Sequence, residues 1–131
     1  MDEVPIRSGD DVVRVRQQVR NAAAENGLSL VDQTKLVTAA SELARNTLVH
    51  GGGGVAQIEV VKSANGRAGV KLHFTDEGPG IADLTLALTD GWTSGTGLGL
   101  GLSGTRRLVD EFELNSKPGA GTSVMVVKWS R

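Results

Sequence analysis

Two polar residues of complementary chemistry, Glu42 and Asn46, stand four positions apart in a stretch, residues 30–49, whose apolar residues recur at helical spacing. Residues four apart on an α-helix share one face. A carboxylate can accept the proton of a hydroxyl group, and an amide oxygen can bind Mg²⁺ directly. On a helix, however, two polar residues roughly opposite an apolar stripe are most often only solvated. The pair therefore indicates chemistry only if other site residues accompany it.

A second candidate group begins at Asp76, which follows an expected strand at 69–75 and precedes Gly78 and Gly80. A carboxylate at a strand end can accept a hydrogen bond from an exocyclic amine, such as N6 of adenine. Glycines allow a ring to lie against the backbone. The same D-x-G-x-G pattern is also common in ordinary turns.

A ladder of glycines at Gly97, Gly99 and Gly101 precedes a predicted helix over 101–110. Backbone amides in such a loop and at a helix start can bind phosphate, so the ladder predicts a flexible lid over a nucleotide. A plain surface loop is the alternative. The spacing also fits the dinucleotide fingerprint, but no apolar strand precedes it, and the phosphate-loop and eukaryotic-type kinase motifs are absent from the sequence.

Composition narrows the class of protein. The chain has 131 residues, which predicts a single domain over 1–131, and its net charge of −1 gives no basic footprint for nucleic acid. It has no cysteine for disulfides or thiolate metal sites, and no apolar run of membrane-spanning length. The amino terminus is acidic rather than signal-like, so a cytoplasmic protein without a membrane partner is expected.

The remaining patterns predict helices packed on one face of a mainly antiparallel sheet, an α+β fold. Ser8 and Asp11 form a possible capping box for the first helix, and Asn65-Gly66 marks a hairpin. The expected helices cover 10–26, 30–49, a turn or two within 84–88, and 101–110; the expected strands cover 4–7, 55–61, 69–75, 112–116 and 122–129.

Four short motifs follow one another along the chain: ELARN at 42–46, DEGPG at 76–80, GLGLG at 97–101 and GAGT at 119–122. In this order, and over nearly the full chain, the sequence resembles the GHKL ATPase family, which includes the ATP-binding domains of gyrase, Hsp90, histidine kinases and MutL. It looks most like the small serine kinases that regulate alternative sigma factors, in particular the RsbT-type switch kinases of stressosome modules. The resemblance implies a Bergerat fold, a two-layer α/β sandwich with a mainly antiparallel mixed sheet and a glycine-rich ATP lid.

The resemblance also implies residue roles. Asn46 would ligate Mg²⁺, Glu42 would be the general base or water-orienting group, and Asp76 would receive adenine N6. Thr122 falls where the family places a hydroxyl near that aspartate. Arg45 and Arg106 are only candidates for phosphate ligands. The glycine-rich positions implied to shape the base pocket or cradle phosphates are Gly78, Gly80, Gly97, Leu98, Gly99, Leu100 and Gly101.

The implied activity is Mg·ATP-dependent phosphorylation of a serine or threonine on a STAS-domain antagonist or scaffold protein. After release, the kinase would bind and activate a phosphatase, expected to be of the PP2C type. Two alternatives stay open: an anti-sigma factor kinase that sequesters a sigma factor and phosphorylates the anti-anti-sigma factor, and a nucleotide-gated binding module with negligible turnover. Retention of both Glu42 and Asn46 favours an enzyme over a pure binding module.

Overall fold

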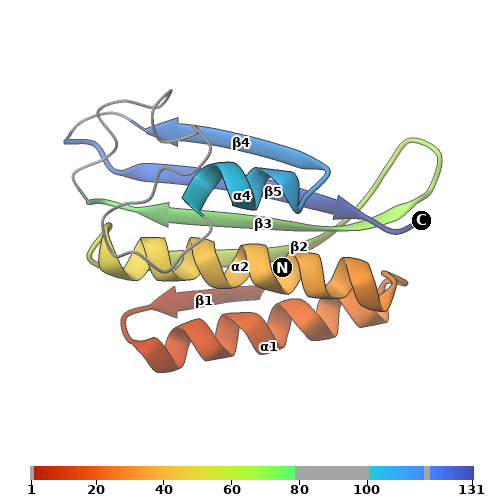
Figure 1. Ribbon diagram of the computed structural model, residues 1–131, viewed down its shortest axis with the longest axis horizontal. Coiled ribbons are helices and arrows are strands. Elements are labelled where there is room, and N and C mark those ends of the chain that lie inside the picture. The colour runs from red at the N-terminus through yellow and green to blue at the C-terminus, as the bar shows by residue number, and fades with distance from the viewer. Residues whose placement is uncertain (1, 79–100, 117–118) are drawn as a thin grey trace.

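The central helix of the structure, α2 (Leu30–Val49), lies across one face of a five-stranded sheet, and α1 (Gly9–Glu25) and α4 (Gly101–Arg107) flank it (Figure 1). This computed structural model describes residues 2–78, 101–116 and 119–131. The elements follow in the order β1 (Asp2–Ile6), α1 (Gly9–Glu25), α2, β2 (Gly54–Lys62), β3 (Ala68–Asp76), α4 (Gly101–Arg107), β4 (Glu111–Ser116) and β5 (Thr122–Trp129).

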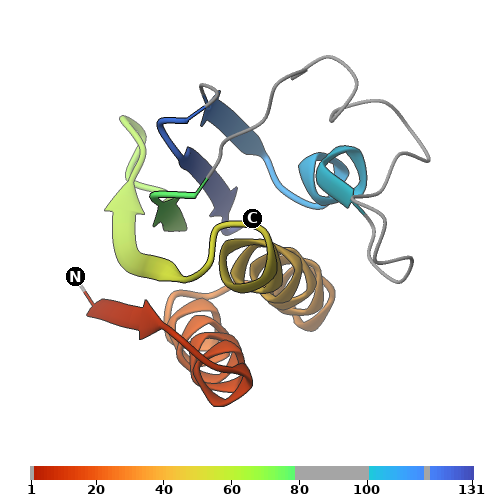
Figure 2. The ribbon, with the colours of Figure 1, turned by 90° about the vertical axis from the view of Figure 1, so that its left-hand side faces the viewer.

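The strand order is β1-β2-β3-β5-β4, and every pairing among the described strands is antiparallel. Figure 2 looks at the end of the molecule where α2 and β3 finish and shows the three helices on the same side of the sheet. The predicted α+β fold with helices on one face is confirmed. Among the described strands the sheet is wholly antiparallel rather than mixed.

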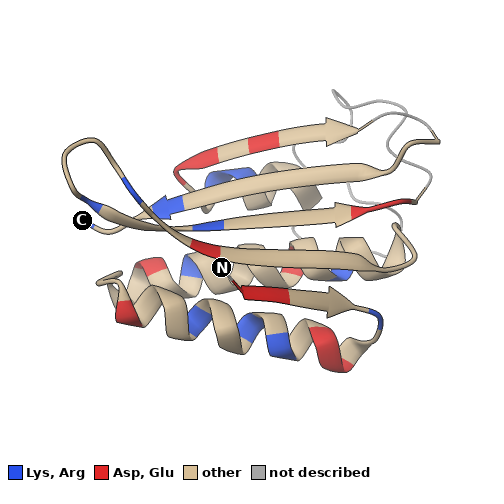
Figure 3. Cartoon of the chain, turned by 180° about the vertical axis from the view of Figure 1, so that it is seen from behind, with Lys and Arg blue, Asp and Glu red and all other residues tan. Residues whose placement is uncertain are grey.

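Alternation along the strands decides which face the helices cover. Leu72 and Phe74 on β3 are buried against the helices, whereas His73 between them lies on the opposite face and bonds Ser123 through its Nε2 at 2.6 Å. Leu36 and Leu43 of α2 are buried in the same core. The opposite face carries no described helix, and acidic residues lie along β4 there (Figure 3).

One helix start has a side-chain cap that was not predicted, and the predicted capping box at the other is absent. The Ser29 side chain accepts a hydrogen bond from the Asp32 amide at 3.1 Å and so caps α2. Ser8 occupies the cap position of α1 but makes no side-chain cap bond. Asp11 instead accepts from the amide of Arg7 at 2.8 Å, so the predicted capping box does not form as such.

The helix predicted over residues 101–110 is shorter in the structure, where α4 ends at Arg107. The amide of Asp110 donates to the carbonyl of Val127 at 2.9 Å, and its carboxylate accepts from the amide of Trp129 at 2.7 Å. These bonds draw the chain onto β5 before another helical turn can form.

A cluster of charged residues surrounds the carboxyl end of β5, far from Asp76 at the carboxyl end of β3. The buried Lys128 amine lies 3.6 Å from the carboxylates of Asp32 and Asp110, and Arg131 reaches Asp110 at 2.8 Å. Burial by itself would raise the pKa of Asp110. The Trp129 amide and the charges of Lys128 and Arg131 outweigh burial, so this pKa is held below its ordinary value. No helix in the described part of the chain is long and apolar enough to cross a membrane.

Candidate functional site

The carboxyl end of α2 and the carboxyl end of β3 meet at Gly51. The Asn46 carbonyl accepts from the amides of His50 at 2.9 Å and Gly51 at 3.2 Å, which closes the end of the helix. A Cβ atom built on Gly51 would lie 2.4 Å from Cγ of Asp76, closer than such atoms come in real proteins. Only a glycine therefore allows the helix end to rest on the Asp76 side chain.

Asp76 is the last residue of β3 and is half-buried. Its Oδ1 accepts a hydrogen bond from the Gly78 amide at 2.9 Å, which fixes the carboxylate in an Asx turn. Gly78 in turn packs on the Gly51 backbone, where a Cβ on Gly78 would lie 2.7 Å from the Gly51 Cα. The first step of the DEGPG motif thus holds Asp76 at the end of the sheet.

Thr122 lies directly opposite Asp76 in the β3–β5 register, as the resemblance implied. Its hydroxyl is 3.0 Å from the hydroxyl of Ser116 on β4, and Ser116 also donates to the Gly121 carbonyl at 3.0 Å. A Cβ on Gly121 would lie 2.1 Å from the Asp76 carbonyl oxygen. Gly121, with its positive φ of 84°, therefore lets β5 start close against Asp76.

Glu42 is not on a solvated face, contrary to what its position roughly opposite the apolar stripe indicates. Glu42 as a whole is only 7% exposed, and its Oε1 accepts a hydrogen bond from Nη1 of Arg45 at 2.9 Å. Asn46 is half-buried. In the described part of the chain, α2 contacts the sheet, α1 and α4.

The site residues divide into two groups by their placement. The first group lies within the described residues. Four of its members stand where α2 and β3 end and β5 begins: Asn46, Asp76, Gly78 and Thr122. The fifth, Glu42, lies one turn earlier on α2. Gly101 begins α4 with a positive φ of 70°. The predicted positions Gly80, Gly97, Leu98, Gly99 and Leu100, and the predicted helical turn at 84–88, lie outside the described residues.

The sequence did not predict how four further residues contribute to this geometry. Gly51 stands in none of the four motifs, Gly121 entered only as part of the GAGT motif, and Arg45 was assigned a role only as a candidate phosphate ligand. Ser116 was not singled out, and its position becomes apparent only from its register opposite Thr122. Gly51 and Gly121 are recognisable once strand pairing is known, because each approaches Asp76, which is distant in sequence. Arg45 instead acts on Glu42, three residues away on the same helix.

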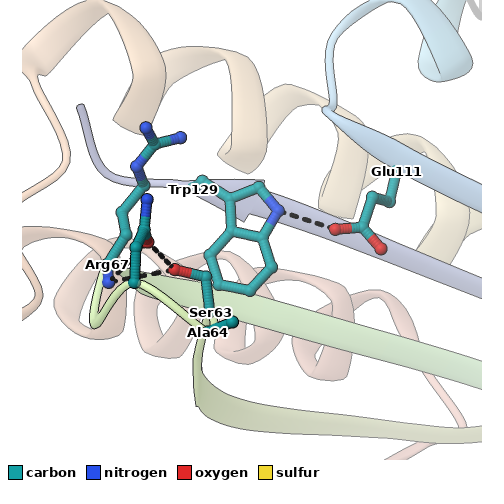
Figure 4. A pocket seen from close by; sticks show the side chains of 6 residues that line it. Ser63, Ala64, Arg67, Glu111 and Trp129 are labelled. Carbon is teal, nitrogen blue, oxygen red and sulfur yellow. Dashed lines mark hydrogen bonds between the residues drawn. The ribbon is translucent and has the colours of Figure 1, made fainter.

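A hollow at the other end of β3 contains none of the predicted site residues (Figure 4). Trp129 dominates it, with its indole Nε1 donating to Glu111 at 2.6 Å. The ring also covers Gly69, where a Cβ would lie 2.6 Å from the indole. The other lining residues are Ser63, Ala64, Asn65 and Arg67.

The donor set near Asp76 suits a purine nucleotide and its metal. A carboxylate held by one backbone amide retains acceptor capacity for an exocyclic amine. The amide oxygen of Asn46 is a ligand type that Mg²⁺ accepts when phosphates and water complete its shell. In the described part of the chain, no three acidic or histidine residues gather to hold a metal.

The sequence from residue 31 to 130 matches the family model of histidine kinase-, DNA gyrase B- and HSP90-like ATPases. The chain belongs to this family. It is 46% identical over 121 residues to the serine/threonine-protein kinase RsbT of Bacillus subtilis, covering 92% of this chain and 90% of that protein. It is 28% identical to the anti-sigma F factor of Thermoanaerobacter sp. over 87% of this chain and 82% of that protein.

Two solved structures share the fold. The RsbU and RsbW domains of Rv1364c from Mycobacterium tuberculosis match all of this chain and 33% of that one, with a TM-score of 0.64 and 23% identity. The mycobacterial sensor histidine kinase MprB matches 99% of this chain and 97% of that one, with a TM-score of 0.59 and 19% identity. With the family model and the RsbT relative, the chain is an ATP-binding protein serine/threonine kinase of the GHKL type.

Proposed function

We propose that the protein is a cytoplasmic, single-domain kinase that transfers phosphate from Mg·ATP to a serine or threonine of a STAS-domain protein in a stress-signalling partner-switching module. The observation that carries the proposal is the placement of a buried carboxylate, Glu42, one turn from Asn46 on the helix whose end rests on Asp76. The RsbT and anti-sigma relatives support a kinase that exchanges protein partners.

Asp76 would hold the adenine amine, with Gly78 and Thr122 shaping the base pocket and Asn46 ligating Mg²⁺. When bound, Mg·ATP supplies the transferable phosphoryl group and a metal charge that offsets its oxygens. Glu42 would accept the proton of the acceptor hydroxyl on its carboxylate as that oxygen is phosphorylated. Contacts to the base and the phosphates are also proposed for Gly80, Gly97, Leu98, Gly99, Leu100 and Gly101.

Helix α2 packs against the sheet, α1 and α4, and this packing makes it a rigid support for these groups. Positioning and charge neutralisation account for most of the catalysis in phosphoryl transfer, so side chains held on a packed helix suit the reaction. A pure binding module would not need a buried carboxylate beside the metal ligand, since burying one without function is costly.

We further propose that the dephosphorylated partner holds the kinase and that the released kinase binds and activates a PP2C-type phosphatase. An anti-sigma factor kinase is the second candidate. The 28% identity to an anti-sigma F factor is the observation that favours it, against 46% identity to RsbT.

The test uses the purified chain, Mg²⁺, γ-labelled ATP and candidate STAS proteins. Label on a STAS serine or threonine, lost in Glu42→Ala and Asn46→Ala, is the expected result. Tight ATP binding with no transfer to any STAS protein would overturn the kinase proposal and leave a nucleotide-gated module. A sigma factor that binds the chain in an ATP-dependent manner would favour the second candidate.

A further inference from the structure

The buried carboxylate of Glu42 has one recorded ion-pair partner among the described residues, the guanidinium of Arg45 three residues on. The two side chains differ greatly in exposure, 10% for Glu42 and 45% for Arg45. A buried carboxylate that loses its partner is left with an uncompensated charge. Arg45 therefore stabilises the charge of Glu42 more than an exposed ion pair stabilises a surface helix.

The bond uses one atom of each group, Nη1 of Arg45 and Oε1 of Glu42, 2.9 Å apart. A carboxylate has two oxygens, and a guanidinium is a rigid planar fork. Fixing Oε1 restricts rotation about the last bond of the glutamate and so fixes the direction of Oε2 as well. A general base must lie within about 3 Å of the proton it removes, so this restriction bears directly on catalysis.

We infer that Arg45 is a positioning residue for Glu42: it holds one carboxylate oxygen so that the other is presented to the acceptor hydroxyl. The inference rests on the proposed kinase function. It differs from the expectation that Arg45 is a phosphate ligand, because it predicts an effect on the rate of transfer and not on nucleotide affinity.

The chain contains a matched control pair on a different helix. On α1, Nη1 of Arg14 lies 2.7 Å from Oδ1 of Asp11, with the same spacing in sequence and side-chain exposures of 56% and 13%. This pair stands at the start of α1, and its hydrogen bonds, to Arg7 and between its two members, involve none of the described residues assigned to the site. Arg14→Gln therefore reports what loss of a similar helix ion pair does in general.

The experiment compares Arg45→Gln, Arg45→Lys, Glu42→Gln and the double variant Glu42→Gln/Arg45→Gln with Arg14→Gln. Measured are kcat and KM for transfer to a STAS protein, Kd for ADP with Mg²⁺ by calorimetry, and Tm of the free chain. We expect Arg45→Gln to lower kcat by about tenfold or more, as loss of general-base geometry does. Kd for ADP should stay within about twofold, and Arg14→Gln should leave kcat unchanged.

Two further outcomes identify action through Glu42. In the Glu42→Gln background, Arg45→Gln should lower kcat no further, because the carboxylate it positions is gone. Arg45→Lys should restore only part of the rate, since an ammonium lacks the planar fork. In the free chain, Arg45→Gln should lower Tm more than Arg14→Gln does.

An increase in Kd for ADP with kcat unchanged would overturn the inference and make Arg45 a nucleotide ligand. Equal losses of kcat in the wild-type and Glu42→Gln backgrounds would also overturn it. Failure of the wild-type chain to transfer phosphate to any STAS protein would instead refute the proposed function. The Tm comparison of Arg45→Gln with Arg14→Gln then still measures the pairing itself.

Discussion

Replacing Gly51 by alanine would insert a methyl group between the end of α2 and Asp76. The new Cβ would lie 2.4 Å from Cγ and 2.7 Å from Oδ2 of Asp76, whereas ordinary contact begins at 3.4 Å. One of the two groups must therefore move by about 1 Å. Because Gly78 also packs on the Gly51 backbone, retreat of the helix end would disturb that contact too, so displacement of the Asp76 side chain is the expected response.

A shift of this size would take the 2.9 Å bond between Asp76 Oδ1 and the Gly78 amide out of hydrogen-bond range. Overpacking of this kind costs about 1–3 kcal/mol in stability. If Asp76 holds the adenine amine, loss of that charge-assisted bond is worth about 1.5–3 kcal/mol. The corresponding rise in Kd for ATP is about 10- to 150-fold.

Calorimetric titration of ATP into Gly51→Ala, at a temperature where urea unfolding shows the variant to be folded, measures this effect. Gly52→Ala is the matched control. Gly52 has a positive φ of 73° but nothing within 4 Å of its Cβ position, so the variant loses about 1–3 kcal/mol of stability through backbone strain without touching Asp76. Its ATP affinity should equal that of the wild type.

Wild-type ATP affinity in Gly51→Ala would refute the reasoning, because it would mean that the position of Asp76 does not govern nucleotide binding. Equal losses of affinity in Gly51→Ala and Gly52→Ala would refute it as well, since general destabilisation would then suffice as the cause.

The remaining predictions concern stability and are measured by urea unfolding. Ser29→Ala should destabilise the chain by about 1 kcal/mol because it removes the α2 cap, while Ser8→Ala should change little, since Ser8 makes no side-chain cap bond. Asp110→Asn should cost about 1.5–3 kcal/mol at pH 7. Because the folded pKa of Asp110 lies below the unfolded value of about 3.8, its contribution is present above pH 3.8 and is lost as pH falls through the folded pKa. The difference between wild type and Asp110→Asn should therefore shrink as pH falls below 3.8; a constant difference down to pH 2 would contradict this.

Most of the fold was predictable because local signals coincide with element ends. The predicted helix at 30–49 and the strand at 122–129 match α2 and β5 residue for residue. Ser29 caps the helix, and glycines stop it, so no tertiary information is needed there. The length of the helix after residue 101 was wrong, because Asp110 bonds β5, and no local pattern indicates that bond.

The site was predictable as a set of residue types but not as an arrangement. Asp76 and Thr122 proved to face each other across strands, as the resemblance implied. The burial of Glu42 was not predicted, because the spacing of residues along a helix does not show what packs over its sides. Gly51 and Gly121 matter because two backbone segments distant in sequence approach Asp76, and this approach follows from register rather than from local pattern.

The most direct test of the central claim separates the binding of ATP from its chemistry in two single variants. Asp76→Asn and Glu42→Gln are each measured for ATP affinity and for transfer of labelled phosphate to a STAS protein. The account predicts that Asp76→Asn loses affinity, whereas Glu42→Gln binds ATP as the wild type does and transfers phosphate at least 100-fold more slowly. Transfer by Glu42→Gln at the wild-type rate would contradict the account.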